Sequence, residues 1–481
     1  MKIALLNPPY KGKRYSRDSR SPAVTRSGTI YYPIWLSYAA GALDETGDFD
    51  IKIIDSPASN LSFENTIKNI KDFSPNLILV NTSTPSVDED LTLTKKLKSE
   101  LKHSFIALSG THATIYSDEL LKDNTEIDMV LRGEYDYTLR ELAYAIKKEN
   151  DFSNIDGLSY RKDGNTIVHN KKRPLIDNLD NIPFVSLIYQ KYLDINNYFF
   201  AAARYPVIMI MTGRGCPYQC SWCLYPQVMH GRRYRFRSVE NVMEELKFIK
   251  SRLPMVKEIG FEDDTFTADK NRCIKICERI ISEELNINWY ADARADLDFE
   301  TMELMKKAGC RLLIAGFESG NQKILNNIKK GITLSQSIEF MRNARKLNML
   351  VHGCFVLGNP GETEETMQET IDFAIKLNPD TAQFFPMIIY PGTESYGIAE
   401  KNNQIKVNKF DDWLKDGLHR SVVDSDNLKS DAVDAYCRLA RRKFYLRKNY
   451  IFYKIFQSVK NPEELKRNFK AFKTFSRHIL R

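Results

Sequence analysis

Short apolar runs alternate with amphipathic stretches over the first 150 residues of the chain. Five of these runs predict buried strands, at residues 3–6, 51–54, 77–80, 105–108 and 129–131. Apolar positions recur at helical spacing between them, as in residues 91–101 and 138–147. Strands that alternate with helices in this way are typical of an α/β fold with a doubly wound parallel sheet. Ligands in that architecture bind beyond the carboxyl ends of the strands.

The same alternation resumes near residue 201. Six further strands are predicted, near residues 207–212, 257–262, 287–292, 311–317, 350–357 and 381–389. Six strand–helix units in a row predict a parallel barrel, and parallel barrels gather their chemistry at the carboxyl ends of the strands.

The chain is therefore expected to have four parts. Residues 1–150 form the first α/β domain, and residues 201–395 form the barrel. Residues 151–200 connect the two and contain a β-hairpin that turns at Asp163-Gly164. Residues 396–481 form a basic helical C-terminal region. Its helices are expected at residues 431–444, 451–459 and 462–478.

Composition narrows the class of protein. With 43% apolar and 27% charged residues, the 481-residue chain has a globular composition rather than a disordered one. No apolar run reaches the ~18–20 residues of a membrane span, and proline interrupts the N-terminal apolar segment too soon for a signal peptide. Eight cysteines in so long a chain indicate a reducing compartment, so we expect a cytoplasmic location.

Three of the cysteines, Cys216, Cys220 and Cys223, follow the first barrel strand with the spacing C-x3-C-x2-C. Gly215 and Pro217 place them on a loop, which argues against the alternative of buried cysteines without a metal. Thiolates bind soft metals such as zinc or iron–sulfur clusters. A structural zinc site normally has four ligands. Three cysteines instead suit a [4Fe–4S] cluster that leaves one iron open to another ligand.

This loop resembles that of the radical S-adenosylmethionine (SAM) enzymes. The resemblance implies that the barrel is the partial (βα)6 barrel of that family and that SAM binds the open iron. It further implies that SAM is cleaved reductively to a 5′-deoxyadenosyl radical, with a flavodoxin- or ferredoxin-type protein as electron donor.

The predicted barrel strands end in residues that suit SAM, and the resemblance places its binding site there. Seven positions are predicted to contact SAM: Trp222, Glu262, Asp263, Arg294, Glu318, Ser319 and Gly358. Carboxylates at the second strand end accept hydrogen bonds from the SAM amino group, and a guanidinium binds its carboxylate in a bidentate fork. Glu318 or Ser319 would reach the ribose, and Trp222 would pack beside the adenine. Salt bridges, helix caps and a core aromatic are the alternatives at single positions.

The loops at the strand ends of the first domain lack a G-x-G-x-x-G motif, so a nicotinamide or flavin dinucleotide is disfavoured. They are rich in glycine and small hydroxyl residues, which let a large planar ligand approach the backbone; ordinary loop and helix-cap chemistry is the alternative. The domain resembles the Rossmann-like cobalamin-binding domain of the cobalamin-dependent radical SAM family. Nine positions are predicted to contact cobalamin: Asn7, Pro8, Thr82, Ser83, Thr84, Gly110, Thr111, Gly133 and Glu134.

The Asp-x-His-x-x-Gly motif of methionine synthase has no counterpart here, and no histidine lies between Met1 and Lys102. The resemblance therefore implies a cobalt without a histidine lower ligand. His112 is expected to be a loop contact rather than a cobalt ligand. The expected cofactors are a [4Fe–4S] cluster, SAM and cobalamin.

The basic charge of the chain is concentrated in its tail. The net charge is +8, of which residues 438–481 carry +12, so the rest of the chain carries −4. The predicted helix 462–478 places Leu465, Phe469, Phe472 and Phe475 on one stripe, with lysines and an arginine elsewhere. Such a helix can lie on an anionic membrane surface. Packing against the barrel is an equal alternative, and nucleic-acid binding is disfavoured.

Three stretches, residues 213–227, 316–325 and 326–331, are similar to the hopanoid-biosynthesis-associated branch of the family. They resemble the anaerobic Mg-protoporphyrin ester cyclase-like branch more distantly. The resemblance implies an enzyme that cleaves SAM and functionalises an unactivated carbon. Our main expectation is radical cyclisation or ring rearrangement of a small-molecule or lipid-linked substrate in a lipid, sugar or tetrapyrrole-type pathway. The alternatives are a cobalamin-dependent radical SAM C-methyltransferase and, third, a cobalamin-sensing regulator without catalysis.

Overall fold

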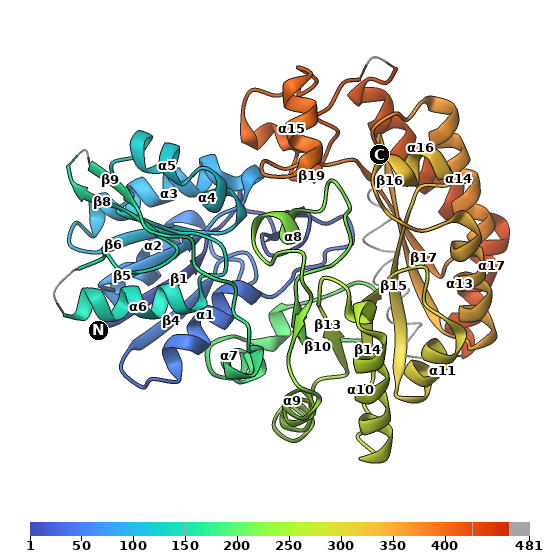
Figure 1. Cartoon of the computed structure of the whole chain (residues 1–481), viewed down its shortest axis with the longest axis horizontal. Coiled ribbons are helices and arrows are strands. Elements are labelled where there is room, and N and C mark those ends of the chain that lie inside the picture. The colour runs from blue at the N-terminus through green and yellow to red at the C-terminus, as the bar shows by residue number, and fades with distance from the viewer. Residues whose placement is uncertain (149–150, 165, 426, 461–481) are drawn as a thin grey trace.

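The computed structural model describes residues 1–148, 151–164, 166–425 and 427–460. Two α/β units lie side by side, one built from the N-terminal part of the chain and the other around a second sheet (Figure 1). Helices follow the second sheet in the C-terminal region. The expected α/β class is thereby confirmed.

The first sheet has the strand order β4-β1-β5-β6-β7-β8-β9. Its first five members are parallel to one another and coincide with the five strands predicted from the apolar runs. They are β1 (Lys2–Asn7), β4 (Asp50–Asp55), β5 (Leu77–Asn81), β6 (Phe105–Ser109) and β7 (Met129–Leu131).

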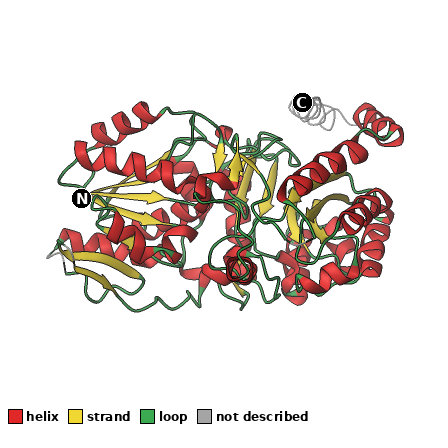
Figure 2. Cartoon of the chain, turned by 90° about the horizontal axis from the view of Figure 1, so that it is seen from above, coloured by secondary structure: helices red, strands yellow, loops and turns green. Residues whose placement is uncertain are grey.

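The pleat of these strands explains why they read as unbroken apolar runs. In β1, Ile3 and Leu5 enter one buried cluster, whereas Ala4 and Leu6 enter another on the opposite face. Figure 2 shows helices on both sides of this sheet. One side is covered by α1 (Ile34–Asp44) and α6 (Asp136–Lys147), the other by α2 (Phe63–Phe73), α3 (Val87–Glu100) and α5 (Ser117–Asp123).

The hairpin of the predicted connector extends the first sheet. Its strands, β8 (Leu158–Asp163) and β9 (Thr166–His169), pair antiparallel, and β8 pairs antiparallel with β7. The chain then passes through α7 (Val185–Tyr192), which packs on α1 and leads into the second sheet.

The second sheet contains six parallel strands in chain order. They are β10 (Val207–Ile210), β13 (Glu258–Phe261), β14 (Trp289–Ala293), β15 (Cys310–Glu318), β16 (Leu350–Leu357) and β17 (Thr381–Pro386). Each matches a predicted strand. Among the described strands β10 and β17 form the two edges and do not pair with each other, so the barrel is open.

Helices follow the first five barrel strands; the cluster loop precedes the helix after β10, and two helices follow β15. Ser238, Asp269 and Asp298 begin three of these helices by accepting a backbone N–H of the first turn. The helices are α9 (Val239–Arg252), α10 (Lys270–Ser282), α11 (Phe299–Lys307), α12 (Gln322–Asn327), α13 (Leu334–Lys346) and α14 (Glu364–Leu377).

The C-terminal region contains α15 (Glu394–Lys401), α16 (Ser430–Tyr445) and α17 (Lys448–Lys460). Two of the predicted helices, 431–444 and 451–459, are present; the third, 462–478, lies outside the described residues. Within the described part of the chain, no helix combines the length and apolarity needed to cross a membrane. Short elements complete the fold: β2 (Tyr15–Ser16), β3 (Ala23–Val24), α4 (Thr111–Ile115), β11 (Gly213–Arg214), α8 (Leu224–Val228), β12 (Arg235–Phe236), β18 (Leu414–Lys415) and β19 (Leu418–His419).

Candidate active site

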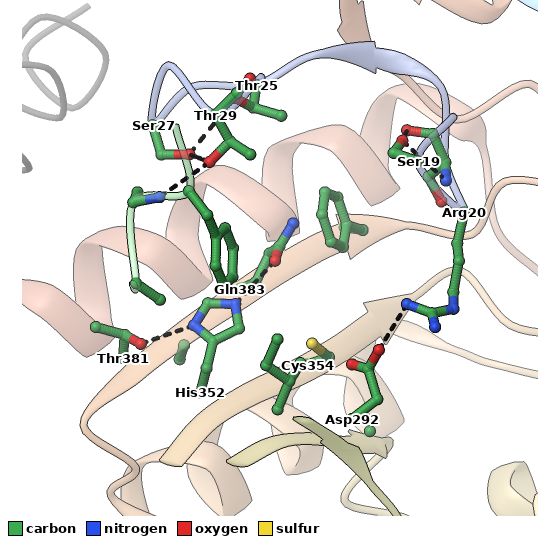
Figure 3. Close-up of a pocket in the computed structure, with 18 of the residues that line it drawn as sticks. Ser19, Arg20, Thr25, Ser27, Thr29, Asp292, His352, Cys354, Thr381 and Gln383 are labelled. Carbon is green, nitrogen blue, oxygen red and sulfur yellow. Dashed lines mark hydrogen bonds and ion pairs between the residues drawn. The ribbon is translucent and has the colours of Figure 1, made fainter. Parts of the chain in front are cut away.

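A cavity of about 1170 Å³ lies between the two units, at the carboxyl ends of the barrel strands. Residues 18–35 of the first unit form its opposite wall, and part of α17 lies at its rim. Figure 3 shows Arg20 extending from that wall to Asp292 of β14, with its guanidinium 2.8 Å from the carboxylate. One cavity therefore touches both units.

The three loop cysteines, Cys216, Cys220 and Cys223, all line this cavity. Gly215 gives the loop its shape, because its φ is +89° and a Cβ there would lie 2.2 Å from the carbonyl oxygen of Arg233. The sequence predicts this loop from its glycine and proline, and the structure places its sulfurs on one side of the barrel mouth.

Asp264 anchors the cysteine loop to the barrel. Its carboxylate accepts the N–H of Gly215 at 2.9 Å and lies 2.9 Å from Nδ1 of His230. The contact with His230 lowers the pKa of Asp264, which keeps this carboxylate charged although it is buried. Burial raises the pKa of the Cys216 and Cys223 thiols, so their deprotonation is linked to metal binding.

Four of the seven predicted SAM contacts line the cavity: Trp222, Glu262, Arg294 and Glu318. Glu318 pairs with Lys330 at 2.7 Å, and Arg294 packs its guanidinium on the ring of Tyr218, 3.6 Å from the centroid. Arg294 also donates to the carbonyl oxygens of Lys330 and Gly331. These contacts link the cysteine loop to the ends of β14 and β15.

Glu262 accepts a hydrogen bond from Tyr290 at 2.8 Å and lies beside Asp292 and Arg20. Burial, followed by the negative charge of Asp292, raises the pKa of Glu262 to about 7. The carboxylate is therefore poised to exchange its proton near neutral pH, and a cationic partner such as an ammonium group would favour the charged form.

The other three predicted SAM contacts do not reach the cavity. Asp263 points the other way, where it accepts hydrogen bonds from Thr212 and Tyr234. Ser319 is buried against Thr370, with 3.1 Å between the hydroxyl oxygens. 

Gly358 faces α16 instead of the cavity. A Cβ at this position would lie 2.8 Å from the side chain of Val433, and its φ of +86° favours glycine. Gly358, like Asp263 and Ser319, thus packs the strand-end loops on the side that faces away from the cavity.

Strand alternation explains which acidic residues face the cavity. β13 ends at Phe261, and Glu262 and Asp264 line the cavity while Asp263 between them does not. The two-residue period of an extended chain could have selected Asp264 in place of Asp263 from the sequence. The partner Arg20, by contrast, comes from a distant segment, and Lys330 follows Glu318 by twelve residues in the next loop; neither carries a local signal.

A polar group that the sequence did not single out lies on the floor of the cavity, on β16 and β17 (Figure 3). Nδ1 of His352 is 2.7 Å from the hydroxyl of Thr381, and its Nε2 is 2.9 Å from Oε1 of Gln383. Cys354 follows on the same face of β16. The neighbouring lining is largely apolar and includes Met209, Ile314, Val356, Phe384 and Ile388.

The nine predicted cobalamin contacts lie at the carboxyl ends of the strands in the first sheet, but none of them lines the cavity. Segment 8–17 of the chain packs on part of this edge. Tyr15 places its hydroxyl 2.9 Å from that of Ser83, and Arg17 is fully buried against Asp90 and Asn7.

Gly110 and His112 of these loops pack against other residues of the chain. A Cβ on Gly110 would lie 2.2 Å from the carbonyl oxygen of Thr82. His112 lies 3.3 Å from the hydroxyl of Thr84 and packs against Phe410; burial lowers its pKa to about 3. Glu134 pairs with Arg235 of the second unit.

The first unit meets the cavity through residues 18–35 instead, and Trp35 is the largest side chain of that wall. The indole N–H groups of Trp35 and Trp222 are buried and have no hydrogen-bond acceptor among the described residues. A buried donor without a partner is costly, so both groups suit a ligand that brings an acceptor into the cavity.

Two family models match the chain. The Radical SAM superfamily model covers residues 210–374, and the B12 binding domain model covers residues 20–143. An uncharacterized methyltransferase of Pyrococcus horikoshii is 35% identical over 459 residues, which cover 95% of this chain and 95% of the relative. The chain belongs to the cobalamin-binding radical SAM family.

Other members of the family have different names. The anaerobic magnesium-protoporphyrin IX monomethyl ester cyclase of Cereibacter sphaeroides is 26% identical over 435 residues, covering 88% of this chain and 68% of the cyclase. The hopanoid C-3 methylase of Methylococcus capsulatus is 26% identical over 372 residues, covering 76% and 68%.

Two solved structures share the fold. The cobalamin-dependent S-adenosylmethionine radical enzyme OxsB with aqua-cobalamin bound has a TM-score of 0.72 at 18% identity, covering 98% of this chain and 72% of that one. The radical S-adenosylmethionine methyltransferase TsrM from Kitasatospora setae, with cobalamin and a [4Fe–4S] cluster bound, has a TM-score of 0.69 at 17% identity, covering 91% and 90%.

The radical SAM and B12-binding domains imply three cofactors, namely a [4Fe–4S] cluster, SAM and cobalamin. The cluster fits the residues present, because three cysteines of one loop face a common cavity. Among the residues that the structure describes, no three His, Cys, Asp or Glu side chains come close enough to hold a single metal ion.

SAM fits beside the cluster loop, where carboxylates, a guanidinium and an unpartnered indole N–H line the same wall. None of the nine predicted cobalamin contacts lines the cavity, and their assignment stays a prediction. The wall formed by residues 18–35 borders the cavity and includes the buried indole N–H of Trp35.

Proposed function

We propose that this radical SAM enzyme is a cobalamin-dependent C-methyltransferase that acts on an apolar carbon substrate. The observation that carries the proposal is that one cavity is lined by the cysteine loop, by residues on or directly after all six barrel strands, and by the first unit. A methyl donor held by the first unit and a substrate held by the barrel would share this space without passing through water. The relative from Pyrococcus horikoshii, itself named a methyltransferase, supports the same reaction class.

The proposed roles of the barrel residues follow from their positions. Cys216, Cys220 and Cys223 hold the cluster, which supplies the electron for SAM cleavage when a flavodoxin- or ferredoxin-type protein reduces it. Glu262 accepts hydrogen bonds from the SAM amino group, and Arg294 orients the SAM carboxylate. Both side chains are already held in place by neighbours, so little side-chain freedom is lost on binding.

Two further groups complete the proposed site. Glu318, held by Lys330, is placed to accept a hydrogen bond from a ribose hydroxyl. Arg20 and Asp292 close the cavity on the side of the first unit and exclude water from the reacting atoms. Trp35 donates its indole N–H to cobalamin, which supplies the methyl group when bound.

The substrate is proposed to lie on β16 and β17. Its apolar part contacts side chains such as Phe384 and Val356, and a single polar group reaches the amide of Gln383. His352 orients that amide by donating its Nε2–H to the amide oxygen Oε1. The N–H groups of Gln383 then remain as donors for the substrate.

Radical cyclisation, our main expectation from the sequence, is the second candidate function. The cyclase of Cereibacter sphaeroides supports it, but at lower identity and coverage than the methyltransferase relative. The third alternative, a cobalamin-sensing regulator without catalysis, is disfavoured because the chain belongs to a family of radical SAM enzymes.

Anaerobic reconstitution with iron, sulfide, hydroxocobalamin, SAM and a chemical reductant tests the proposal, so that SAM is the only source of the methyl group. SAM that carries a trideuterated methyl group is supplied together with an extract of the native cells as substrate source. We expect 5′-deoxyadenosine and a product three mass units heavier than the same product from unlabelled SAM. A product that forms with 5′-deoxyadenosine but carries no deuterium would refute methyl transfer and favour cyclisation.

A further inference from the structure

The last described helix, α17, has an unusual surface. Of the sixteen large apolar side chains that are exposed among the described residues, seven lie between Leu446 and Val459. The others are scattered over both units. Phe452 is 69% exposed and Val459 is 79% exposed. A concentration of this kind on a soluble surface marks an interaction site.

The same helix forms part of the cavity rim. Ile451, Ile455 and Val459, spaced four residues apart, line the cavity mouth. Phe452 is not among the lining residues and points elsewhere on the helix. Figure 1 shows α17 at the outer end of the barrel unit, far from the first sheet. The apolar surface is therefore continuous with the entrance of the cavity.

The charge around this helix has one sign. From residue 435 to residue 460 the chain has no aspartate or glutamate, and its cations include Arg442, Lys443 and Lys448, all exposed. Exposed aromatic and aliphatic residues mixed with cations are typical of helices that lie in the interfacial layer of an anionic membrane.

Self-association through the same surface is disfavoured on electrostatic grounds. A twofold interface brings the same patch of both copies together. Two copies of α17 would then place their arginine and lysine side chains against each other without an acidic residue of the same segment between them. Anionic headgroups supply the missing opposite charge.

We infer that α17 docks the protein on an anionic lipid bilayer, with Phe452 inserted among the lipids and the cavity mouth turned toward the membrane. The docking does not depend on whether the reaction is methyl transfer or cyclisation. Its failure would therefore leave the proposed function standing.

Co-sedimentation of the reconstituted full-length protein with vesicles tests this inference. We expect binding to vesicles that contain phosphatidylglycerol, at least ~10-fold weaker binding to pure phosphatidylcholine, and release of the protein in high salt. Equal partitioning into both kinds of vesicle, or binding to neither, would overturn the inference.

Phe452→Glu is the informative variant, because it replaces an exposed ring outside the cavity. It should lower the partition coefficient for anionic vesicles at least ~10-fold, since it removes the ring that would insert among the lipids and adds a charge that the anionic headgroups repel. Ile281→Glu, on the exposed side of α10, is the matched control and should bind as the wild type does. Cluster absorbance and 5′-deoxyadenosine formation should stay unchanged in both variants.

Sedimentation velocity without lipid tests whether a second copy of the chain, rather than a membrane, covers α17. A wild-type dimer that Phe452→Glu converts to a monomer, together with unchanged vesicle binding, would assign the surface to a second copy of the chain and contradict the membrane.

Discussion

The carboxyl ends of the strands in the two sheets carry similar residue types but differ in what lies over them. At the carboxyl ends of the first sheet, segment 8–17 fills the space and buries Arg17 against Asp90. At the carboxyl ends of the barrel strands, side chains such as Glu262 and Glu318 line an open cavity. Both edges present polar side chains and glycines, so residue types alone do not separate them. A strand end becomes a site only where no other segment of the chain covers it.

The largest expected effect concerns the open edge. Cys220→Ala should abolish both the iron–sulfur absorbance and 5′-deoxyadenosine formation, because a cluster on two cysteines of this loop lacks its third protein ligand. The control is Cys354→Ala, which removes a thiol from the same cavity but not from the loop. A full complement of iron and sulfide in the Cys220 variant would refute the cluster assignment.

The next effect concerns the closed edge. Arg17→Ala should lower the free energy of unfolding by about 3–5 kcal/mol, since it leaves the fully buried carboxylate of Asp90 without its ion pair. Arg14→Ala, an exposed arginine of the same segment, is the control and should stay within about 0.5 kcal/mol of the wild type. Denaturant unfolding measures both. Equal stability of the two variants would show that segment 8–17 does not hold the edge closed.

A pH dependence follows from the raised pKa of Glu262 at the open edge. Folding raises this pKa from its ordinary value to about 7, so the folded protein binds the proton more tightly than the unfolded chain does. The stability contributed by this group is therefore present at low pH and is lost as the pH rises through 7. Glu262→Gln removes the loss and should raise the thermal midpoint at pH 8.5 more than at pH 6.

Thermal scans of the reconstituted protein without SAM measure this difference. Glu244→Gln, an exposed glutamate on α9, should leave the midpoint unchanged at both pH values. A Glu262 variant whose midpoint shifts equally at pH 6 and 8.5 would contradict the assignment.

The smallest effect tests whether cobalamin meets the wall at residues 18–35 or the covered strand ends. Trp35→Phe should weaken cobalamin binding ~2- to 10-fold, because one hydrogen bond contributes about 0.5–1.5 kcal/mol. Thr82→Ser keeps the hydroxyl that donates to Asp90 and should bind cobalamin as the wild type does. Absorbance titration of the cofactor measures both, without any need for turnover. Weaker cobalamin binding by Thr82→Ser than by Trp35→Phe would instead assign the cofactor to the strand ends.

Much of the fold could be predicted because its signals are local. The five parallel strands of the first sheet appear as apolar runs because both of their faces are buried, and the six barrel strands were also predicted although one face of strands such as β16 and β17 lines the cavity. The cysteine loop follows from the spacing of Cys216, Cys220 and Cys223 and from the glycine before them. Asp264 rather than Asp263 lines the cavity beside Glu262, and the two-residue period of the strand end is a local signal for this difference.

The rest depended on contacts between distant segments. Arg20 reaches Asp292 across 272 positions of chain, and Lys330 reaches Glu318 from another loop. Neither pairing leaves a periodic trace in the sequence, because an ion pair constrains two side chains and not the residues around them. The same holds for Arg17, which is buried against Asp90 and Asn7 over the first sheet.

Local signals in the sequence were sufficient to predict the parallel strands of both sheets, the cluster loop and the family to which the chain belongs. Alternation, apolar runs and cysteine spacing carry these features within a few residues of one another. Which strand ends line the cavity became visible only once the two units were packed together. That outcome is set by where residues 8–35 lie against both units, and the position of a segment between two folded units depends on its packing with them rather than on its own pattern.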